Sequence, residues 1–149
     1  MTRSQRLDPL LKLRQRHQDE AAQQVAARDA ALAEQQARLD ALQRYAADYS
    51  QQPLQGGTIN PALLANRLAF QEKLQQAVVQ QKQVVATTQQ ASDVERTRLM
   101  LASREKHVLE KLAASYRADE TRVADQRVQR ELDDLGSRRR TASAGTDTP

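Results

Sequence analysis

The sequence predicts an all-α protein of two long helices that form an antiparallel coiled-coil hairpin, in which the second helix is longer. Proline and glycine, the residues that interrupt helices, occur only near the ends and in one central segment of the 149-residue chain. Aromatic residues make up 3% of the chain and tryptophan is absent, so a globular core is not expected. The good helix formers Ala, Gln, Leu and Arg dominate the composition.

The helix boundaries follow from capping signals. Asp8 before Pro9 predicts the start of helix one, and Asn60 before Pro61 repeats this signal for helix two. Gly136 predicts the end of helix two. The segment between the helices contains the turn formers Pro53, Gly56 and Gly57. We expect one hairpin over residues 1–136, with helix one at about 5–50, a turn at 51–60, helix two at 61–135 and a disordered tail at 137–149.

Apolar residues recur at seven-residue steps in both predicted helices. Such a step keeps one line of side chains facing a partner helix. Polar residues that interrupt the line weaken pairing but fix its register. The series are Val25, Leu32, Leu39 and Ala46 in helix one and Val94, Leu101 and Val108 in helix two; the interrupting residues are Arg14, Gln18, Arg28 and Gln35.

The short turn predicts antiparallel helices of unequal length. A pivot near Gly56 would place Pro9 opposite Ser103. Helix two would then extend past helix one by about 32 residues, or roughly 48 Å. This arm, Lys106–Leu135, carries apolar residues without an intramolecular partner. We expect it to fray, to self-associate or to bind another protein.

Three of the four aromatic residues, Tyr45, Tyr49 and Phe70, lie within about four helical turns of the loop. Leu42, Leu74 and Ala77 come from the same part of the hairpin. One interpretation is that these side chains only hold the end of the hairpin together. The other is that they form a docking surface, because two helices cannot bury so many large rings between them.

The composition argues against several functional classes. The net charge is +4, and the 23 basic and 19 acidic residues are interspersed, which does not favour a nucleic-acid binder. There is no cysteine, no apolar run long enough to span a membrane and no catalytic motif. His17 and His107 have no third ligand beside them. We therefore expect a cytosolic protein that is not an enzyme, with no cofactor, metal site or catalytic residue.

In its size, in its unequal helices, in the aromatic region and in the C-terminal arm, the chain resembles the flagellar export protein FliJ family. The resemblance covers almost the whole length of the chain. The aromatic region matches the family's surface patch at Leu42, Tyr45 and Tyr49 on helix one and at Phe70, Leu74 and Ala77 on helix two, with Arg38 and Gln81 at flanking positions. The segments 104–112 and 131–135 resemble the family's C-terminal arm.

The resemblance implies a stalk that inserts into the hexameric flagellar export ATPase and stimulates it. It also implies that the patch binds the export-gate membrane protein, with a chaperone or chaperone-escort role in some members and contacts to export chaperones. The protein would be cytoplasmic and peripherally associated with the inner membrane at the flagellar base. The resemblance assigns Leu42, Tyr45, Tyr49, Phe70, Leu74 and Ala77 to the gate and Lys106, Leu109, Lys111, Leu112, Tyr116, Leu132 and Leu135 to the ATPase.

Three alternatives remain open at this point. The chain could be a stalk-like component of another type III secretion system or of a rotary ATPase. It could be a coiled coil that binds nucleic acid through its arginine-rich arm, in which case binding would depend steeply on salt. It could also be a homodimeric scaffold in which two chains pair along their arms.

Overall fold

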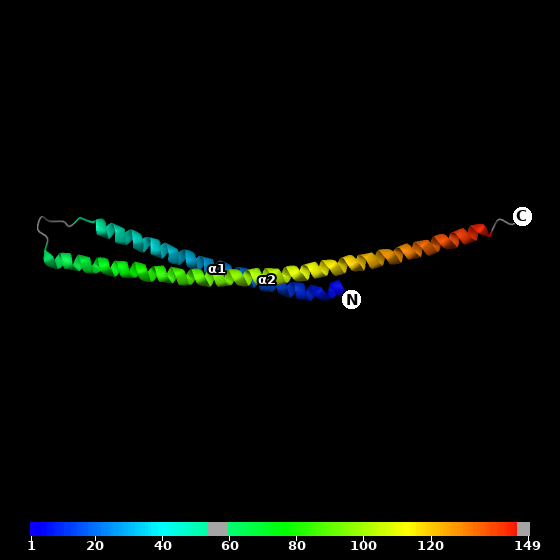
Figure 1. Ribbon diagram of the computed structural model, residues 1–149, viewed down its shortest axis with the longest axis horizontal. Helices are drawn as coiled ribbons and strands as arrows, with labels where there is room; N and C mark the ends of the chain where they lie inside the picture. Colours follow the sequence, from blue (N-terminus) through cyan, green and yellow to red (C-terminus); the bar gives the residue numbers. More distant parts are fainter. Residues whose placement is uncertain (54–59, 146–149) are drawn as a thin grey trace. The chain divides into compact units, whose positions relative to one another are not determined.

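The computed structural model describes residues 1–53 and 60–145, and within these it contains two helices. Helix α1 spans Arg3–Gln51 and helix α2 spans Pro61–Ala144 (Figure 1). The prediction of an all-α fold with a longer second helix is confirmed. The turn residues Gly56 and Gly57 lie outside the described residues.

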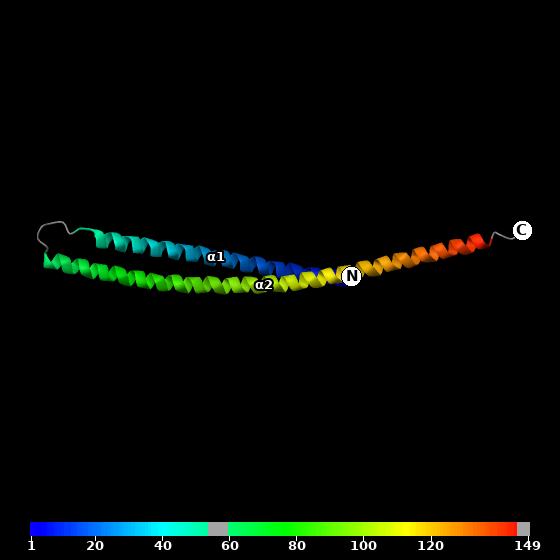
Figure 2. The same ribbon diagram turned by 45° about the horizontal axis from the view of Figure 1, so that its top comes forward.

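The chain divides into two compact units, which we describe separately. Unit 1 combines Met1–Arg16 with Ser103–Pro149, and unit 2 is His17–Ala102. Each unit therefore contains part of α1 and part of α2. Figures 1 and 2 both show the cyan end of α1 beside the green start of α2, within unit 2.

Side-chain contacts show that the helices pair antiparallel in both units. In unit 2, Gln81 Nε2 donates to the Gln35 carbonyl at 3.0 Å, while Ser92 Oγ donates to Asp29 Oδ1 at 2.6 Å. Contacts thus move backward along α1 as they move forward along α2. Unit 1 shows the same order, because Arg14 pairs with Glu105 at 2.6 Å and Ser4 contacts Glu120.

The seam between the helices follows seven-residue repeats but is only partly apolar. The buried apolar residues are Ala46, Leu74, Val78 and Ala113. Ser4, Ser92 and Glu95 are also buried, and each has a polar partner. Pairing removes much of the cost of burying these groups, which is why polar residues can occupy the seam.

The predicted seam of helix two is wrong. Val94, Leu101 and Val108 are 51%, 50% and 64% exposed, whereas Ser92 is fully buried and Glu95 is 7% exposed. The apolar series marks a different line along the helix from the one that faces α1. On helix one, Arg14, Gln18 and Gln35 are half-buried as expected, but Arg28 is exposed and its neighbour Asp29 turns toward α2.

The predicted start of helix one is also wrong. Helix α1 begins at Arg3 and Pro9 lies inside it. Thr2 is the cap instead: its hydroxyl accepts the Gln5 N–H at 3.4 Å, while Gln5 Oε1 accepts the Thr2 N–H at 3.1 Å. This reciprocal capping box satisfies two helix-end donors. It starts the helix before the proline signal at Asp8 is reached.

The start of helix two is confirmed. Asn60 Oδ1 accepts the Ala62 N–H at 3.0 Å, and the Asn60 carbonyl accepts the Leu64 N–H at 3.1 Å. Pro61 is the first helical residue, where its missing N–H leaves no hydrogen bond unmade.

Gly136 does not end α2, which continues to Ala144, so the predicted disordered tail is wrong for residues 137–144. A single glycine costs about 1 kcal/mol relative to alanine inside a helix, and the neighbouring residues can offset this. Ser137 Oγ donates to the Asp134 carbonyl at 2.8 Å and Thr141 Oγ1 donates to the Ser137 carbonyl at 3.2 Å. Residues 146–149 lie outside the described part of the chain.

The predicted register needs correction as well. Arg117, rather than Ser103, lies beside the start of α1, because its guanidinium is 3.5 Å from Asp8. Helix α1 lies against α2 as far as Glu120, which accepts a hydrogen bond from Ser4. The uncovered part of α2 is residues 121–144, or about 36 Å of helix. The contacts Asp8–Arg117 and Arg14–Glu105 fix this register in unit 1, and the earlier start of α1 lengthens the part of α2 that it covers.

Candidate partner-docking surfaces

The three aromatic side chains of unit 2 form one cluster. The ring centroids of Tyr49 and Phe70 are 4.8 Å apart with the rings at 66°. Tyr45 lies 6.5 Å from each of the other two rings, stacked on Tyr49 at 29° and edge-on to Phe70 at 87°. These are favourable geometries for aromatic pairs. The cluster joins the end of α1 to the third turn of α2.

The cluster is only partly buried. Tyr49 is half-buried, whereas Tyr45 is 53% exposed and Phe70 is 38% exposed. Tyr49 thus fills the interface between the helices and the other two rings extend its apolar surface outward. Exposed aromatic rings that are held in place by one another are well suited to bind a protein partner.

The other predicted members of this surface have different roles. Leu74 is 8% exposed and borders a small hollow with Ala46 and Ser50, so it belongs to the hairpin core. Leu42 and Ala77 are half-buried. Of the six predicted residues, Tyr45 and Phe70 are therefore the most accessible, and we describe the exposed pair together with Tyr49 as the aromatic patch.

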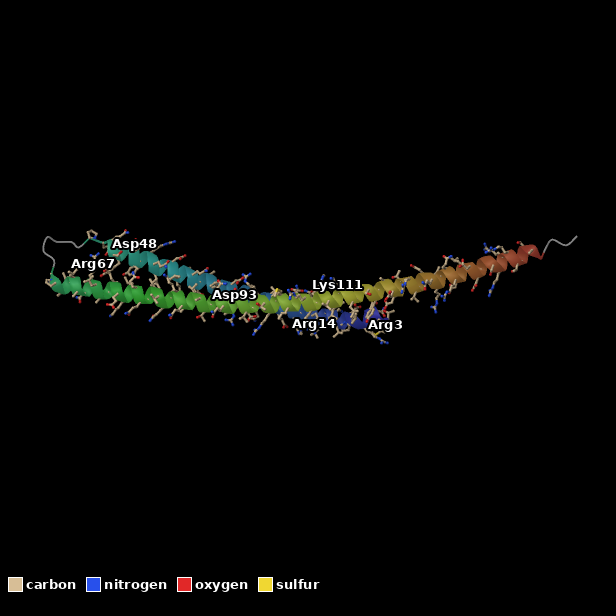
Figure 3. The ribbon with its side chains drawn as sticks, in the orientation of Figure 1. Arg3, Arg14, Asp48, Arg67, Asp93 and Lys111 are labelled. Atoms are coloured by element: carbon tan, nitrogen blue, oxygen red, sulfur yellow. The ribbon has the colours of Figure 1, made fainter. Side chains whose placement is uncertain are left out.

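Arg67 completes this region and was missed by the sequence analysis. Its guanidinium lies 5.6 Å from the centre of the Tyr49 ring. It donates to the Tyr49 carbonyl at 3.1 Å and also to the Gln52 carbonyl. A cation of α2 thus satisfies carbonyls that the end of α1 leaves unpaired, where the helix dipole favours positive charge. Figure 3 labels Arg67 at this end of the helices, with Asp48 on α1.

The residues predicted to bind the ATPase fall into two groups, one in the part of α2 that α1 covers and one beyond it. Lys106, Leu109 and Tyr116 are half-buried in the part of α2 that α1 covers. The remaining predicted residues are exposed, at 38% for Leu112, 57% for Leu132 and 56% for Leu135, and Lys111 is exposed as well. Only Leu132 and Leu135 lie in the uncovered segment 121–144, which we call the free arm. Figure 3 marks Lys111 on α2 and Arg3 and Arg14 on α1.

The beginning of α1 is fastened to α2 by a carboxylate. Glu120 Oε1 accepts the backbone N–H of Ser4 at 3.0 Å, and Glu120 Oε2 accepts its hydroxyl at 2.6 Å. These hydrogen bonds to Ser4 lower the pKa of Glu120 below its ordinary value of 4.5. Arg3 adds a cation–π contact, with its guanidinium 5.9 Å from the centre of the Tyr116 ring.

A second acidic contact lies in unit 2. Asp29 accepts the Ser92 hydroxyl at 2.6 Å and pairs with Arg96 at 2.7 Å. The hydrogen bond from Ser92 is the main reason that the pKa of Asp29 is lowered from 3.8, and Arg96 contributes in the same direction. This contact crosses between the helices and ties one residue of α1 to one turn of α2.

A groove lies where α1 begins, within unit 1. It is bordered by Met1, which precedes α1, by Arg3 at the start of α1, and by Tyr116, Val123 and Arg127 of α2. Its lining combines apolar surface with charges of both signs. It is an open surface groove, of the kind that can accept a chain segment of another protein.

The described residues offer no metal site and no membrane span. No group of three His, Cys, Asp or Glu side chains there could hold a metal ion. Neither described helix contains an apolar stretch that could cross a membrane. The aromatic patch in unit 2 and the free arm in unit 1 are the two candidate surfaces for binding another protein.

A comparison with known families identifies the chain. The model of the flagellar FliJ protein family matches residues 3–144. No curated protein and no solved structure matches the chain. The family match supports a coiled-coil protein related to flagellar export. Because the match covers both described helices, the chain belongs to the flagellar FliJ protein family.

Proposed function

We propose that this protein couples the flagellar export ATPase to the membrane export gate by binding each through a different surface. The aromatic patch of unit 2 binds the gate protein. The free arm of unit 1, with the first turn of α1, binds the hexameric ATPase and stimulates it. The protein does no chemistry itself and works in the cytoplasm, held at the flagellar base by its partners. A role in escorting export chaperones is compatible with the same surfaces.

The observation that carries the gate assignment is the exposure of Tyr45 and Phe70. An aromatic cluster that served only to close the hairpin would bury its rings, yet these two are 53% and 38% exposed. Both keep their positions through ring contacts with Tyr49. Rings that are fixed before binding lose little conformational entropy when a partner covers them.

The gate assignment is tested by affinity measurement with the cytoplasmic part of the gate protein. Replacing Tyr45 and Phe70 by alanine should weaken binding about thirtyfold, which corresponds to about 2 kcal/mol for an aromatic hot spot. The matched control is Leu68→Ala, because Leu68 is 57% exposed and lies outside the ring cluster. Equal loss of affinity in both variants, or no loss in either, would exclude the aromatic patch as the gate site.

The arm assignment is tested by removing only the free arm. A chain that ends at Glu120 retains both residues of the Ser4–Glu120 contact, which holds the start of α1 against α2 in the full chain. We expect this chain to lose stimulation of ATP hydrolysis by the ATPase while it still binds the gate protein. Stimulation equal to that of the full chain would show that residues 121–149 are not the ATPase-binding element.

A further inference from the structure

The free arm has an apolar line of its own. Val128, Leu132 and Leu135 are 54%, 57% and 56% exposed. They are separated by four and three residues, so they lie on one side of the helix. In Figures 1 and 2 the red end of α2, in unit 1, has no second helix beside it.

This line is not the continuation of the seam that faces α1. The groove next to Met1, where α1 would continue if it were longer, is lined by Val123, Arg127 and Arg130. Val128, Leu132 and Leu135 do not border that groove. A helix that simply extended the path of α1 would therefore meet Val123 and two arginines and would leave Val128, Leu132 and Leu135 uncovered.

The charges beside the apolar line indicate what covers it. Glu131 and Arg138 flank the line on the same edge, seven residues apart and with opposite sign. When two helices pair antiparallel, residues of the same edge face each other. Glu131 of one copy then faces Arg138 of the other, and the symmetric pair forms as well. Parallel pairing would instead bring Glu131 to the opposite edge, where Gln129 and Gly136 lie.

We propose that the free arms of two copies of this chain pair antiparallel through this face. Leu132 packs against Leu135 of the second copy, Val128 lies at each border of the contact, and two Glu131–Arg138 pairs set the register. The two chains are related by a two-fold axis, as expected for a homodimer. With only three large apolar residues from each chain, the dimer is weak and dissociates on dilution.

The dimer goes beyond the proposed function and does not depend on it. Leu132 and Leu135 belong to the arm that the proposed function gives to the ATPase. Pairing of two arms and binding of one arm to the ATPase are therefore mutually exclusive. Self-association would keep the arm covered in the free protein.

The first experiment is sedimentation equilibrium of the full chain alone, from about 10 µM to about 1 mM, the range in which a weak dimer is populated. We expect the average mass to rise from that of a monomer toward that of a dimer. Replacing Leu132 and Leu135 by glutamine should remove this rise, and glutamine preserves helix propensity. The control replaces Leu63 and Leu68 by glutamine, which are 62% and 57% exposed in unit 2.

The second experiment tests the antiparallel register by charge reversal. Glu131→Arg alone and Arg138→Glu alone should each raise the dissociation constant on the order of tenfold, because each places like charges together twice. The double variant restores opposite charges and should return close to the original dissociation constant. Asp133→Arg and Arg140→Glu are matched controls, with the same changes of charge at positions off this edge.

Each result bears on the proposal. A chain that stays monomeric throughout the concentration range overturns it. A dimer that survives the Leu132 and Leu135 replacements uses another face, and this also overturns it. A double reversal as weak as the single ones excludes the antiparallel register. Circular dichroism of every variant confirms that a lost dimer does not reflect a lost helix.

Discussion

The two units hold α1 against α2 by different means. In unit 2, residues 61–92 of α2 contain four charged side chains, Arg67, Glu72, Lys73 and Lys82, among many glutamines. Contacts there rest on Leu74, Val78 and the aromatic cluster. Farther along α2 in the same unit, Asp29 adds one charged contact, with Ser92 and Arg96. In unit 1, α2 carries charges throughout, and the polar contacts Arg14–Glu105, Asp8–Arg117 and Ser4–Glu120 join it to α1 beside the buried Ala113.

This difference shows how one repeating architecture can serve two purposes. Apolar packing in unit 2 makes a stable support for exposed aromatic rings, because it involves no charge that salt can screen or pH can titrate. Charged contacts in unit 1 respond to both. The two units also complement the ends of α1 with opposite charges, since Glu120 binds its first turn and Arg67 binds its last carbonyls.

The largest effect is expected from the core of unit 2. Leu74→Ala should lower the free energy of unfolding by about 2 kcal/mol, at the lower end for such a change because a narrow two-helix seam can partly collapse. Urea unfolding followed by circular dichroism measures this. The exposed residue Leu68 provides the control, and Leu68→Ala should change stability by less than about 0.5 kcal/mol. Equal effects would mean that unit 2 has no packed core.

The second-largest effect is expected from the ionised side chain of Glu120 in unit 1, whose contribution to stability depends on pH. The folded-state pKa of Glu120 is lowered, so its ionised form stabilises the fold above its ordinary value of 4.5, and this contribution is lost as pH falls through the lowered pKa. Glu120→Gln should therefore lower the melting temperature at pH 7, by less than Leu74→Ala does. The difference from the wild type should shrink below about pH 4.5.

The control for this pH experiment is Asp125→Asn on the exposed free arm. It should leave the melting temperature nearly unchanged at every pH. Hydrogen exchange of the first turns of α1 adds a local measurement, since Glu120→Gln should speed exchange there and not in unit 2. A constant difference between Glu120→Gln and wild type from pH 7 to pH 3 would contradict an ionised contact.

A smaller effect is expected at Gly136. Gly136→Ala should stabilise α2 by about 0.5–1 kcal/mol locally, because alanine is the better helix former. A side chain has room there, since a Cβ at this position would meet no other atom within 4 Å. Hydrogen exchange of residues 137–144 should slow in the variant. Unchanged, rapid exchange in both proteins would indicate that α2 ends before Gly136.

The smallest effect is expected for Arg14→Gln. Arg14 and Glu105 pair at 2.6 Å, but their side chains are 38% and 56% exposed, and such pairs contribute no more than about 1 kcal/mol. We expect a loss within about 0.5 kcal/mol at low salt and none at high salt. Urea unfolding at two salt concentrations measures it, and a loss that is the same at both would argue against a screened ion pair.

The sequence allowed local features to be predicted better than pairwise ones. The start of α2 at Asn60 and Pro61 was predicted correctly, because the cap and the proline act on their immediate neighbours. The start of α1 was not, since the capping box of Thr2 and Gln5 precedes a proline that a helix can contain. Gly136 was wrongly predicted to end α2, because a helix can also contain a single glycine.

The register between the helices could not be predicted from apolar periodicity. Ser92 and Glu95 occupy seam positions, but their polar side chains are typical of surface residues. Only their hydrogen-bond partners in the structure explain why they are buried. The aromatic cluster was predicted from its composition and its distance from the turn. Which of its rings are exposed, and the role of Arg67 beside it, follow only from the placement of α1 against α2.

The most direct test measures two activities, gate binding and ATPase stimulation, in each of two variants. Binding of the gate protein and stimulation of the ATPase are determined for the Tyr45→Ala, Phe70→Ala double variant and for the chain that ends at Glu120. We predict that the first variant loses only gate binding and the second loses only ATPase stimulation. Loss of both activities in either folded variant would contradict two separate binding surfaces.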